Sequence, residues 1–186
     1  MQYLLRTLRE IVEKRIPKHG THGFEHTERV YKLCKSIGEK TGADMSILLP
    51  AALLHDIARG GPDHAIVSAK MTRSILNELV FESFKIDAIC EAISTHSFSG
   101  GKQPIELEAM ILSDADKLDA MGAVGIYRAA MYSGEKSRSQ GDFIAHFHEK
   151  LLKLKELLFT DTARALAEDR HRYMIKYLKM FDKELT

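Results

Sequence analysis

Three short stretches of the sequence place histidine or acidic residues inside otherwise apolar segments. The first, HGFEHTERV, begins at His22 and contains His26. The second is the pair His55-Asp56, which directly follows the apolar run LLPAALL. The third is SDADKLDAMG at 113–122. A buried carboxylate is unfavourable unless it is paired or binds a metal ion, so these stretches require a chemical explanation.

A divalent metal ion would explain the coincidence of imidazoles and carboxylates. A lone histidine on an apolar face is more often a hydrogen-bonded core residue, but several histidines and acids on separate helices favour a metal site. Mixed imidazole and carboxylate donors suit manganese, iron, cobalt, nickel or zinc better than calcium. Adjacent helical residues point about 100° apart, so His55 and Asp56 can share an ion only at a helix end or from different directions. The glycines that follow Arg59 indicate such an end.

Hydrophobic periodicity predicts helices along the whole chain and no strand. Thr21 is the expected N-cap of the second helix, and Asp44 or Ser46 that of the third. We expect Pro50 in the first turn of the third helix, or else at a kink. The expected helices cover about 2–15, 22–41, a third segment that contains LLPAALLHD, then 64–80, 85–97, 105–121, 122–132, 143–159 and 161–182.

Two polar stretches interrupt this pattern. GGP at 60–62 is expected to break the chain, and SGEKSRSQGD at 133–142 is expected to form an exposed loop. That loop could close over a polyphosphate, although a solvated loop is the simpler interpretation.

Composition indicates an ordinary globular protein of 186 residues, with 45% hydrophobic residues and a formal net charge of +1. Such a charge predicts neither a nucleic-acid polymer nor a membrane as partner. The N-terminal segment mixes charged with apolar residues, which argues against a signal peptide. Cys34 and Cys90 lie in apolar helical patterns and are expected to be buried thiols in a reducing compartment, so we expect a cytoplasmic protein.

The order H…HD…D on an all-helical chain resembles the HD-domain superfamily of metal-dependent phosphohydrolases. The matching residues are His26, the pair His55-Asp56, and Asp116 in DADKL. More closely, the chain resembles a bacterial and archaeal subfamily of short, stand-alone HD proteins. That resemblance rests on H-x3-H-x2-RV, a THSFS segment, DADKLDAMGAVG and the C-terminal stretch FHEKLLKLKELLFTDTARALAEDRHRYM.

The resemblance covers essentially the whole chain and implies an all-α HD-domain bundle of about eight or nine helices. It implies a single domain over 1–186, with the metal-site core at about 20–132 and C-terminal helices at about 143–182 packed on it.

The resemblance also implies a set of metal ligands and a reaction. The implied ligands are His26, His55, Asp56 and Asp116, and the expected ion is Mn²⁺, with Fe²⁺, Co²⁺, Ni²⁺, Zn²⁺ or Mg²⁺ as alternatives. Characterised members of the subfamily are nucleoside triphosphate pyrophosphohydrolases. We therefore expect a metal-activated water to attack phosphorus in a phosphorylated small molecule, most simply a nucleotide.

Several cationic and acidic residues near these positions have two interpretations. Lys117, Arg29 and Arg59 could hold substrate phosphate, or they could be solvated charges or members of ion pairs. Asp119 could orient a ligand histidine, or it could accept a hydrogen bond unrelated to the site.

Three further histidines have more than one possible role, and these are His22, His64 and His96. They could contact substrate or donate a proton to the leaving group. His64 and His96 lie between the HD pair and Asp116, where extra histidines bind a second metal in some HD phosphodiesterases. A structural role is the third interpretation.

Other functions compete with the pyrophosphohydrolase. Within the phosphohydrolases they are a nucleoside 5′-monophosphatase and a cyclic nucleotide or dinucleotide phosphodiesterase; a guanosine-tetraphosphate hydrolase is disfavoured, because such enzymes carry different residues after HD. A different chemistry is a further alternative, because a related helical fold uses two irons and oxygen. A non-catalytic nucleotide sensor or interaction module belongs to another class, and the presence of all four implied ligands argues against a vestigial site.

Overall fold

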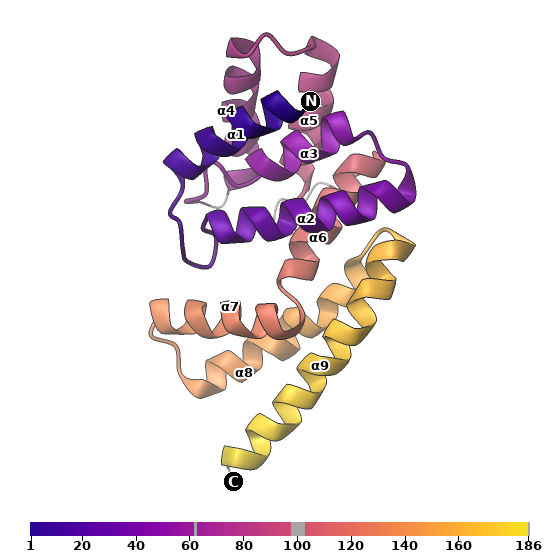
Figure 1. Ribbon diagram of the computed structural model, residues 1–186. Helices are drawn as coiled ribbons and strands as arrows, with labels where there is room; N and C mark the ends of the chain where they lie inside the picture. The colour runs from indigo at the N-terminus through magenta and orange to yellow at the C-terminus, as the bar shows by residue number, and fades with distance from the viewer. Residues whose placement is uncertain (62, 98–102, 186) are drawn as a thin grey trace. The chain divides into compact units, whose positions relative to one another are not determined.

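The computed structural model describes residues 1–61, 63–97 and 103–185, and these residues form helices and no strand (Figure 1). The expected all-α class is confirmed. The predicted break at 60–62 and the THSFS segment at 95–99 fall partly outside the described residues. The elements are α1 (Gln2–Arg15), α2 (Phe24–Thr41), α3 (Met45–Leu54), α4 (His64–Glu78), α5 (Ser83–Thr95), α6 (Leu107–Asp119), α7 (Gly122–Glu135), α8 (Gln140–Glu149), a 3₁₀-helix (Leu151–Leu157) and α9 (Asp161–Leu185).

The chain forms two compact units, Met1–Asp116 and Lys117–Thr186. The boundary falls within α6, directly after the last of the implied metal ligands. The single domain expected over 1–186 stays a prediction, and each unit is described by itself.

The apolar helix α3 is the centre of the first unit. Every residue from Leu48 to Leu54 is buried, and α3 packs against α1, α2 and α5. The Asp44 carboxylate caps the helix by accepting a hydrogen bond from the Ser46 N–H at 2.7 Å. Pro50 lies in the second turn, not in the first as expected. Because α3 ends at Leu54, His55 and Asp56 lie at a helix end, where both are still buried.

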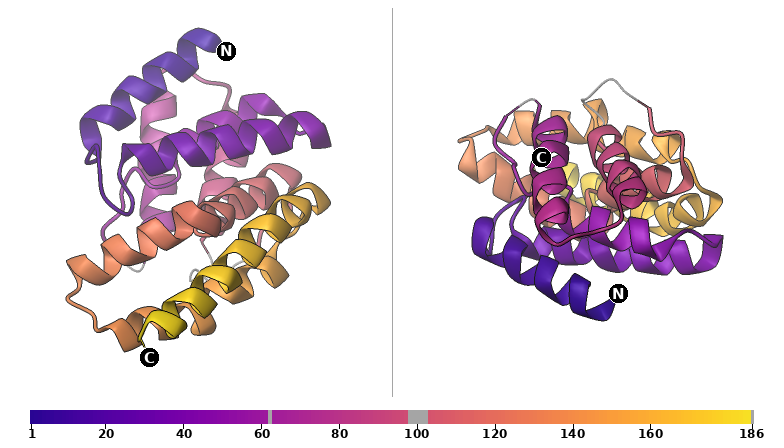
Figure 2. Two further views of the ribbon diagram at one scale, coloured as in Figure 1. Left: turned by 60° about the horizontal axis from the view of Figure 1, so that its bottom comes forward. Right: turned by 90° about the horizontal axis from the view of Figure 1, so that it is seen from above.

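Helices α4 and α5 lie side by side in the same unit (Figure 2). The buried face of α4 includes His64, Ser68 and Thr72, which recur every four residues. A Cys90 thiol on α5 donates to the Ala69 carbonyl at 3.3 Å. The prediction that Cys34 and Cys90 are buried thiols is confirmed.

Helix α2 begins later than the periodicity predicted. Its N-cap is Gly23 and not Thr21, and no side chain caps it. The Phe24 N–H bonds to the Pro17 carbonyl at 2.8 Å, which holds residues 17–23 in a turn. His22 therefore precedes the helix, so it does not share a helical face with His26.

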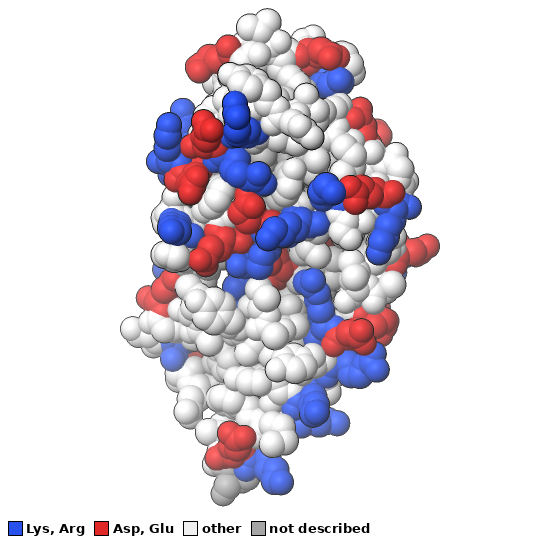
Figure 3. Space-filling model, in the orientation of Figure 1, with Lys and Arg blue, Asp and Glu red and all other residues white. Residues whose placement is uncertain are grey.

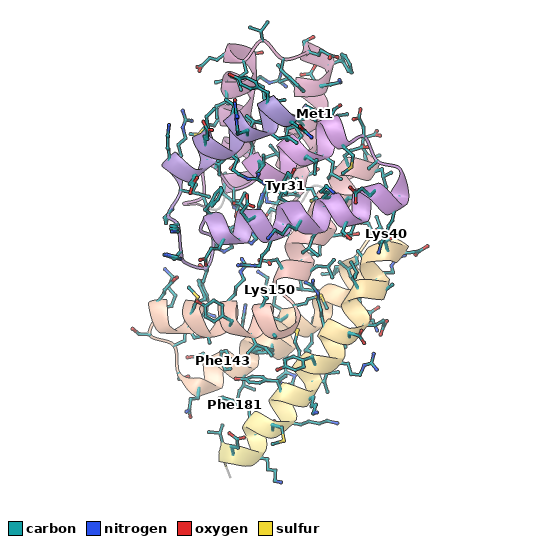
Figure 4. All side chains as sticks on the ribbon, viewed as in Figure 1. Met1, Tyr31, Lys40, Phe143, Lys150 and Phe181 are labelled. Carbon is teal, nitrogen blue, oxygen red and sulfur yellow. The ribbon has the colours of Figure 1, made fainter. Side chains whose placement is uncertain are left out.

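The second unit consists of the end of α6 and the helices that follow it. Phe143 on α8 packs against Phe181 on α9 (Figure 4), with ring centroids 5.7 Å apart. Tyr177 on α9 lies 6.5 Å from Phe143 and 6.1 Å from Phe147 by the same measure. Aromatic pairs at this spacing form a well-packed core.

The predicted loop at 133–142 is shorter in the structure, because α7 continues to Glu135 and α8 begins at Gln140. The Ser139 hydroxyl accepts from the Asp142 N–H, and the Asp142 carboxylate accepts from the Ser139 N–H. This capping box starts α8 inside a stretch too polar to show periodicity. The helix expected at 143–159 divides into α8 and the 3₁₀-helix.

Charges of both signs are interspersed over α1 and α2 on the face shown in Figure 3. No helix in the described part of the chain has the length and apolarity needed to cross a membrane.

Replacing Gly23 by alanine should destabilise the protein. A Cβ atom there would lie 2.6 Å from the His19 carbonyl oxygen and 2.8 Å from that of Pro17. Backbone atoms must move to relieve this overlap, at an expected cost of about 1–3 kcal/mol in the free energy of unfolding. Urea denaturation measures the change. The matched control is Gly134→Ala in α7, where a Cβ meets nothing within 4 Å. Equal stability of the Gly23 variant and the wild type would refute the tight turn.

Candidate metal centre

Four side chains converge in the first unit, two of them on helices α2 and α6 and two directly after the end of α3. His26 on α2 and His55 after α3 have their Nε2 atoms 3.2 Å apart. His26 Nε2 lies 3.7 Å from Asp56 Oδ2 and 3.5 Å from Asp116 Oδ1 on α6. Neighbouring ligands of an octahedral ion with bonds near 2.1 Å are about 3 Å apart, so these separations suit one shared ion. His96, which directly follows α5, joins them through Asp56 Oδ1, 3.7 Å from its Nε2.

Both carboxylates remain ionised despite their burial. Burial alone would raise the pKa of Asp56, but His55, His22, His96 and Arg59 together hold it well below its usual value. Burial likewise opposes the charge on Asp116, and the histidines at 26, 96 and 55 lower its pKa. The cluster thus contains two negative charges. These charges favour either protonated imidazoles or a cation bound between the imidazoles and the carboxylates.

Backbone carbonyls orient two of the imidazoles toward the carboxylates. His55 Nδ1 lies 2.9 Å from the Ala52 carbonyl, and His96 Nδ1 lies 2.6 Å from that of Ile93. A carbonyl only accepts, so each Nδ1 carries a proton. Burial lowers the pKa of His55 to about 4, which leaves its Nε2 as a bare lone pair at neutral pH.

His96 has no hydrogen-bond partner at Nε2, although this atom is buried. Burial lowers the pKa of His96, but Asp56 and Asp116 more than offset this and raise it. The raised pKa favours a proton on this nitrogen, which lies 3.7 Å from Asp56 Oδ1.

Solvent reaches the cluster on the side of His22, Arg59 and Asp116, whose side chains are 29%, 32% and 24% exposed. Arg59 Nη1 donates to Asp56 Oδ1 and Oδ2 at 3.0 and 2.8 Å. His22 Nδ1 lies 3.3 Å from Asp56 Oδ2. An anionic substrate would therefore meet a guanidinium and an imidazole at the opening.

His64, the first residue of α4, also faces Asp56. Its Nε2 lies 3.7 Å from Asp56 Oδ1 and 3.3 Å from Arg59 Nη1. Burial and the adjacent Arg59 charge lower the pKa of His64, which favours a neutral imidazole.

The other three candidate residues are Lys117, Asp119 and Arg29, and the first two have described contacts within the second unit. Lys117 is buried, and its Nζ lies 4.9 Å from the centroid of the Phe159 ring in the second unit. Asp119 forms a buried ion pair with Arg128 at 3.0 Å. Arg29 is half-buried on α2. Their roles toward phosphate or a ligand histidine stay predictions.

Two serines that support the site were not among the candidate residues predicted from the sequence. The Ser113 hydroxyl donates to the His96 carbonyl at 2.8 Å, and the Ser68 hydroxyl accepts from the Ala58 N–H at 3.2 Å. The first anchors the end of α5 to α6, and the second anchors the turn that carries Arg59 to α4. One signal could have indicated Ser68, because it lies four residues after His64 and so about one helical turn along the same face.

The donor set fits a divalent ion of intermediate hardness. Among the described residues, the groups that could share an ion contain only histidine and aspartate. The nearby Cys34 thiol is no alternative ligand, because burial and the charges of Asp116 and Asp114 raise its pKa and keep it protonated.

Comparison with known proteins identifies the family of the chain. The sequence model of the HD domain matches residues 23–121, which include all four residues implied as ligands. The chain belongs to the HD-domain family. It is 39% identical over 176 residues to the protein YpgQ of Bacillus subtilis strain 168, covering 88% of this chain and 84% of YpgQ.

Solved structures of HD proteins have the same fold. The crystal structure of Bacillus subtilis YpgQ in complex with ADP aligns with a TM-score of 0.83 and 34% identity over 97% of each chain. An HD-superfamily hydrolase from Bacillus thuringiensis aligns with a TM-score of 0.79 and 32% identity, over 99% of this chain and 97% of that one. The chain is therefore a metal-dependent HD hydrolase.

Manganese should stabilise the wild-type protein and not an Asp56→Asn variant. A ligand at one hundred times its Kd adds about 2.7 kcal/mol to the free energy of unfolding. The asparagine keeps the shape of the side chain but removes the charge that draws the ion. Thermal unfolding of metal-stripped protein with and without Mn²⁺ measures the difference. Asp87→Asn, at an exposed ion pair with Arg73, is the control and should respond like wild type. An unchanged manganese response in the Asp56 variant would contradict the assignment.

Proposed function

We propose that this protein is a manganese-dependent nucleoside triphosphate pyrophosphohydrolase, whose ion is held by His26, His55, Asp56 and Asp116. The observation that carries the proposal is the convergence of these residues around two ionised carboxylates, of which Asp56 is buried and Asp116 is partly exposed. When bound, a divalent ion supplies positive charge to a phosphoryl group and lowers the pKa of a water molecule.

A nucleotide substrate is supported by a relative and by the charges at the opening. The B. subtilis relative YpgQ was crystallised with ADP. In this chain, Arg59 and His22 lie at the exposed side of the cluster, where a guanidinium and an imidazole can donate hydrogen bonds to phosphate oxygens. Phosphoryl transfer depends mainly on such positioning and charge neutralisation.

The proposed reaction consumes one water and breaks one bond. The water oxygen bonds to the α-phosphorus, the bridging bond between the α- and β-phosphates breaks, and pyrophosphate leaves with the bridging oxygen. The products are a nucleoside monophosphate and pyrophosphate. His64 and His96 lie on the Oδ1 side of Asp56, where an imidazole can hold or pass a proton released from the water.

Hydrolysis of triphosphates in ¹⁸O-labelled water tests the reaction and its regiochemistry. Metal-stripped protein resupplied with Mn²⁺ should yield monophosphate and pyrophosphate, with the label in the monophosphate. Orthophosphate from a monophosphate would support a nucleotidase instead. Nucleotide binding without product in manganese, cobalt, nickel or magnesium would support a sensor and contradict the enzyme proposed here.

An Asp56→Ala substitution should lower kcat/KM by at least about a hundredfold, because even residues that only support a metal ligand contribute that much in other enzymes. Far-ultraviolet circular dichroism should remain helical, since α3 ends before this residue. Wild-type turnover in a folded Asp56→Ala sample would remove this aspartate from the metal site.

A further inference from the structure

The turn that follows α3 leads from two of the implied metal ligands to the arginine at the opening of the site. Residues 55–58 form this turn, and Arg59 comes directly after it. His55 is held at the start of the turn by the Ala52 carbonyl, which lies 2.9 Å from its Nδ1. The path of the chain after Asp56 therefore decides where the Arg59 guanidinium lies.

One backbone N–H in this turn bonds to a side chain of another helix. The Arg59 N–H donates to the Asp56 carbonyl at 3.1 Å, which is a bond within the turn. The Ala58 N–H, one residue earlier, donates to the Ser68 hydroxyl on α4 at 3.2 Å. Ser68 is completely buried, whereas Ala58 is half-buried and Arg59 is exposed. This hydrogen bond thus ties the outer part of the turn to the buried face of α4.

The same face of α4 meets Arg59 at a second point. His64 lies one helical turn before Ser68, and its Nε2 is 3.3 Å from Arg59 Nη1. Nη1 also donates to the two oxygens of the Asp56 carboxylate, at 3.0 and 2.8 Å. Helix α4 therefore contacts both the backbone next to Arg59, through Ser68, and the guanidinium itself, through His64.

The guanidinium has donors left for a phosphate in this orientation. Among the described residues, every hydrogen bond of the Arg59 side chain uses Nη1, and the side chain is 32% exposed. Nη2 and Nε can therefore donate to phosphate oxygens at the opening. A group that is fixed before the ligand arrives binds more tightly, because less conformational entropy is lost on binding.

We propose that Ser68 is a positioning residue for the substrate's phosphates, which holds the turn so that Arg59 presents Nη2 and Nε to the opening of the site. The inference rests on the proposed function and adds to it a residue that acts through Arg59 without touching the substrate. It also predicts which step depends on Ser68, namely the binding of phosphate and not the binding of metal.

Metal binding should not depend on Ser68, because the implied ligands are held by other parts of the chain. His55 and Asp56 directly follow the buried end of α3 and precede Ala58. The other two ligands lie on α2 and α6. Loss of the Ser68 hydroxyl therefore releases the chain beyond the metal ligands, where Arg59 begins.

Binding of ADP to manganese-loaded protein tests the inference without turnover. Metal-stripped protein is titrated with Mn²⁺ by calorimetry, and the manganese-saturated protein is then titrated with ADP. Ser68→Ala should raise the Kd for ADP about tenfold, which is the contribution of one hydrogen bond to a charged group, and should leave the Kd for Mn²⁺ unchanged. With a triphosphate, KM should rise by a similar factor and kcat should change less than KM.

A double-mutant cycle determines whether Ser68 acts through Arg59. Arg59→Ala should itself weaken ADP binding, and Ser68→Ala added to it should cause no further loss. Thr72→Val is the matched control, since it removes another buried hydroxyl of α4 that has no hydrogen-bond partner among the described residues. This variant should bind ADP like wild type. Circular dichroism checks that each variant is folded.

Equal ADP affinity of wild type and folded Ser68→Ala, or additive losses in the double mutant, would overturn the inference. A weaker Mn²⁺ affinity in Ser68→Ala would also overturn it, because Ser68 would then support the metal ligands. Failure of the proposed function is separate, since it is judged by the products formed from a triphosphate. A wild type that binds ADP with the expected dependence on Ser68 but releases no pyrophosphate would refute the proposed reaction alone.

Discussion

The structure of the first unit depends on compensating the charge of two ionised carboxylates, one buried and one only partly exposed. Asp56 and Asp116 lie among imidazoles that hold the pKa of both carboxyl groups low, and the charge of Arg59 adds to this effect at Asp56. An uncompensated charge in such a place would be strongly destabilising, so nearby groups must supply positive charge. Helix α3 makes this environment possible, because it is apolar on all sides and ends one residue before His55. The carbonyls of Ala52 and Ile93 then fix which imidazole nitrogens face the acids.

The need to compensate these two carboxylates also explains why the site suits a metal ion. A divalent ion held by these residues would satisfy the carboxylates and the imidazole lone pairs that face them together. Because His22, Arg59 and Asp116 are the more exposed members, an anionic substrate can approach the ion from that side. The family membership and the ADP bound to YpgQ agree with a phosphorylated substrate.

Much of this arrangement could be predicted from sequence, because helical periodicity is a local signal and the order of His26, His55-Asp56 and Asp116 can be read along the chain. The sequence could not show that His64 and His96 both approach Asp56 Oδ1, since that depends on how α4 and α5 pack on α3. The start of α2 was predicted wrongly because Gly23 packs on carbonyls of a preceding turn, which no periodicity records. The start of α8 was missed because its Ser139–Asp142 capping box lies in a stretch that otherwise resembles a loop.

The most direct test of the account is a crystal structure of the protein grown with Mn²⁺, with data collected to locate manganese by anomalous scattering. The account predicts a peak bonded to His26 Nε2, His55 Nε2, Asp56 and Asp116, on the Oδ2 side of Asp56. A manganese peak that lacks these ligands, or its absence from the cluster at saturating manganese, would contradict the claim that these buried charges exist to hold a metal ion.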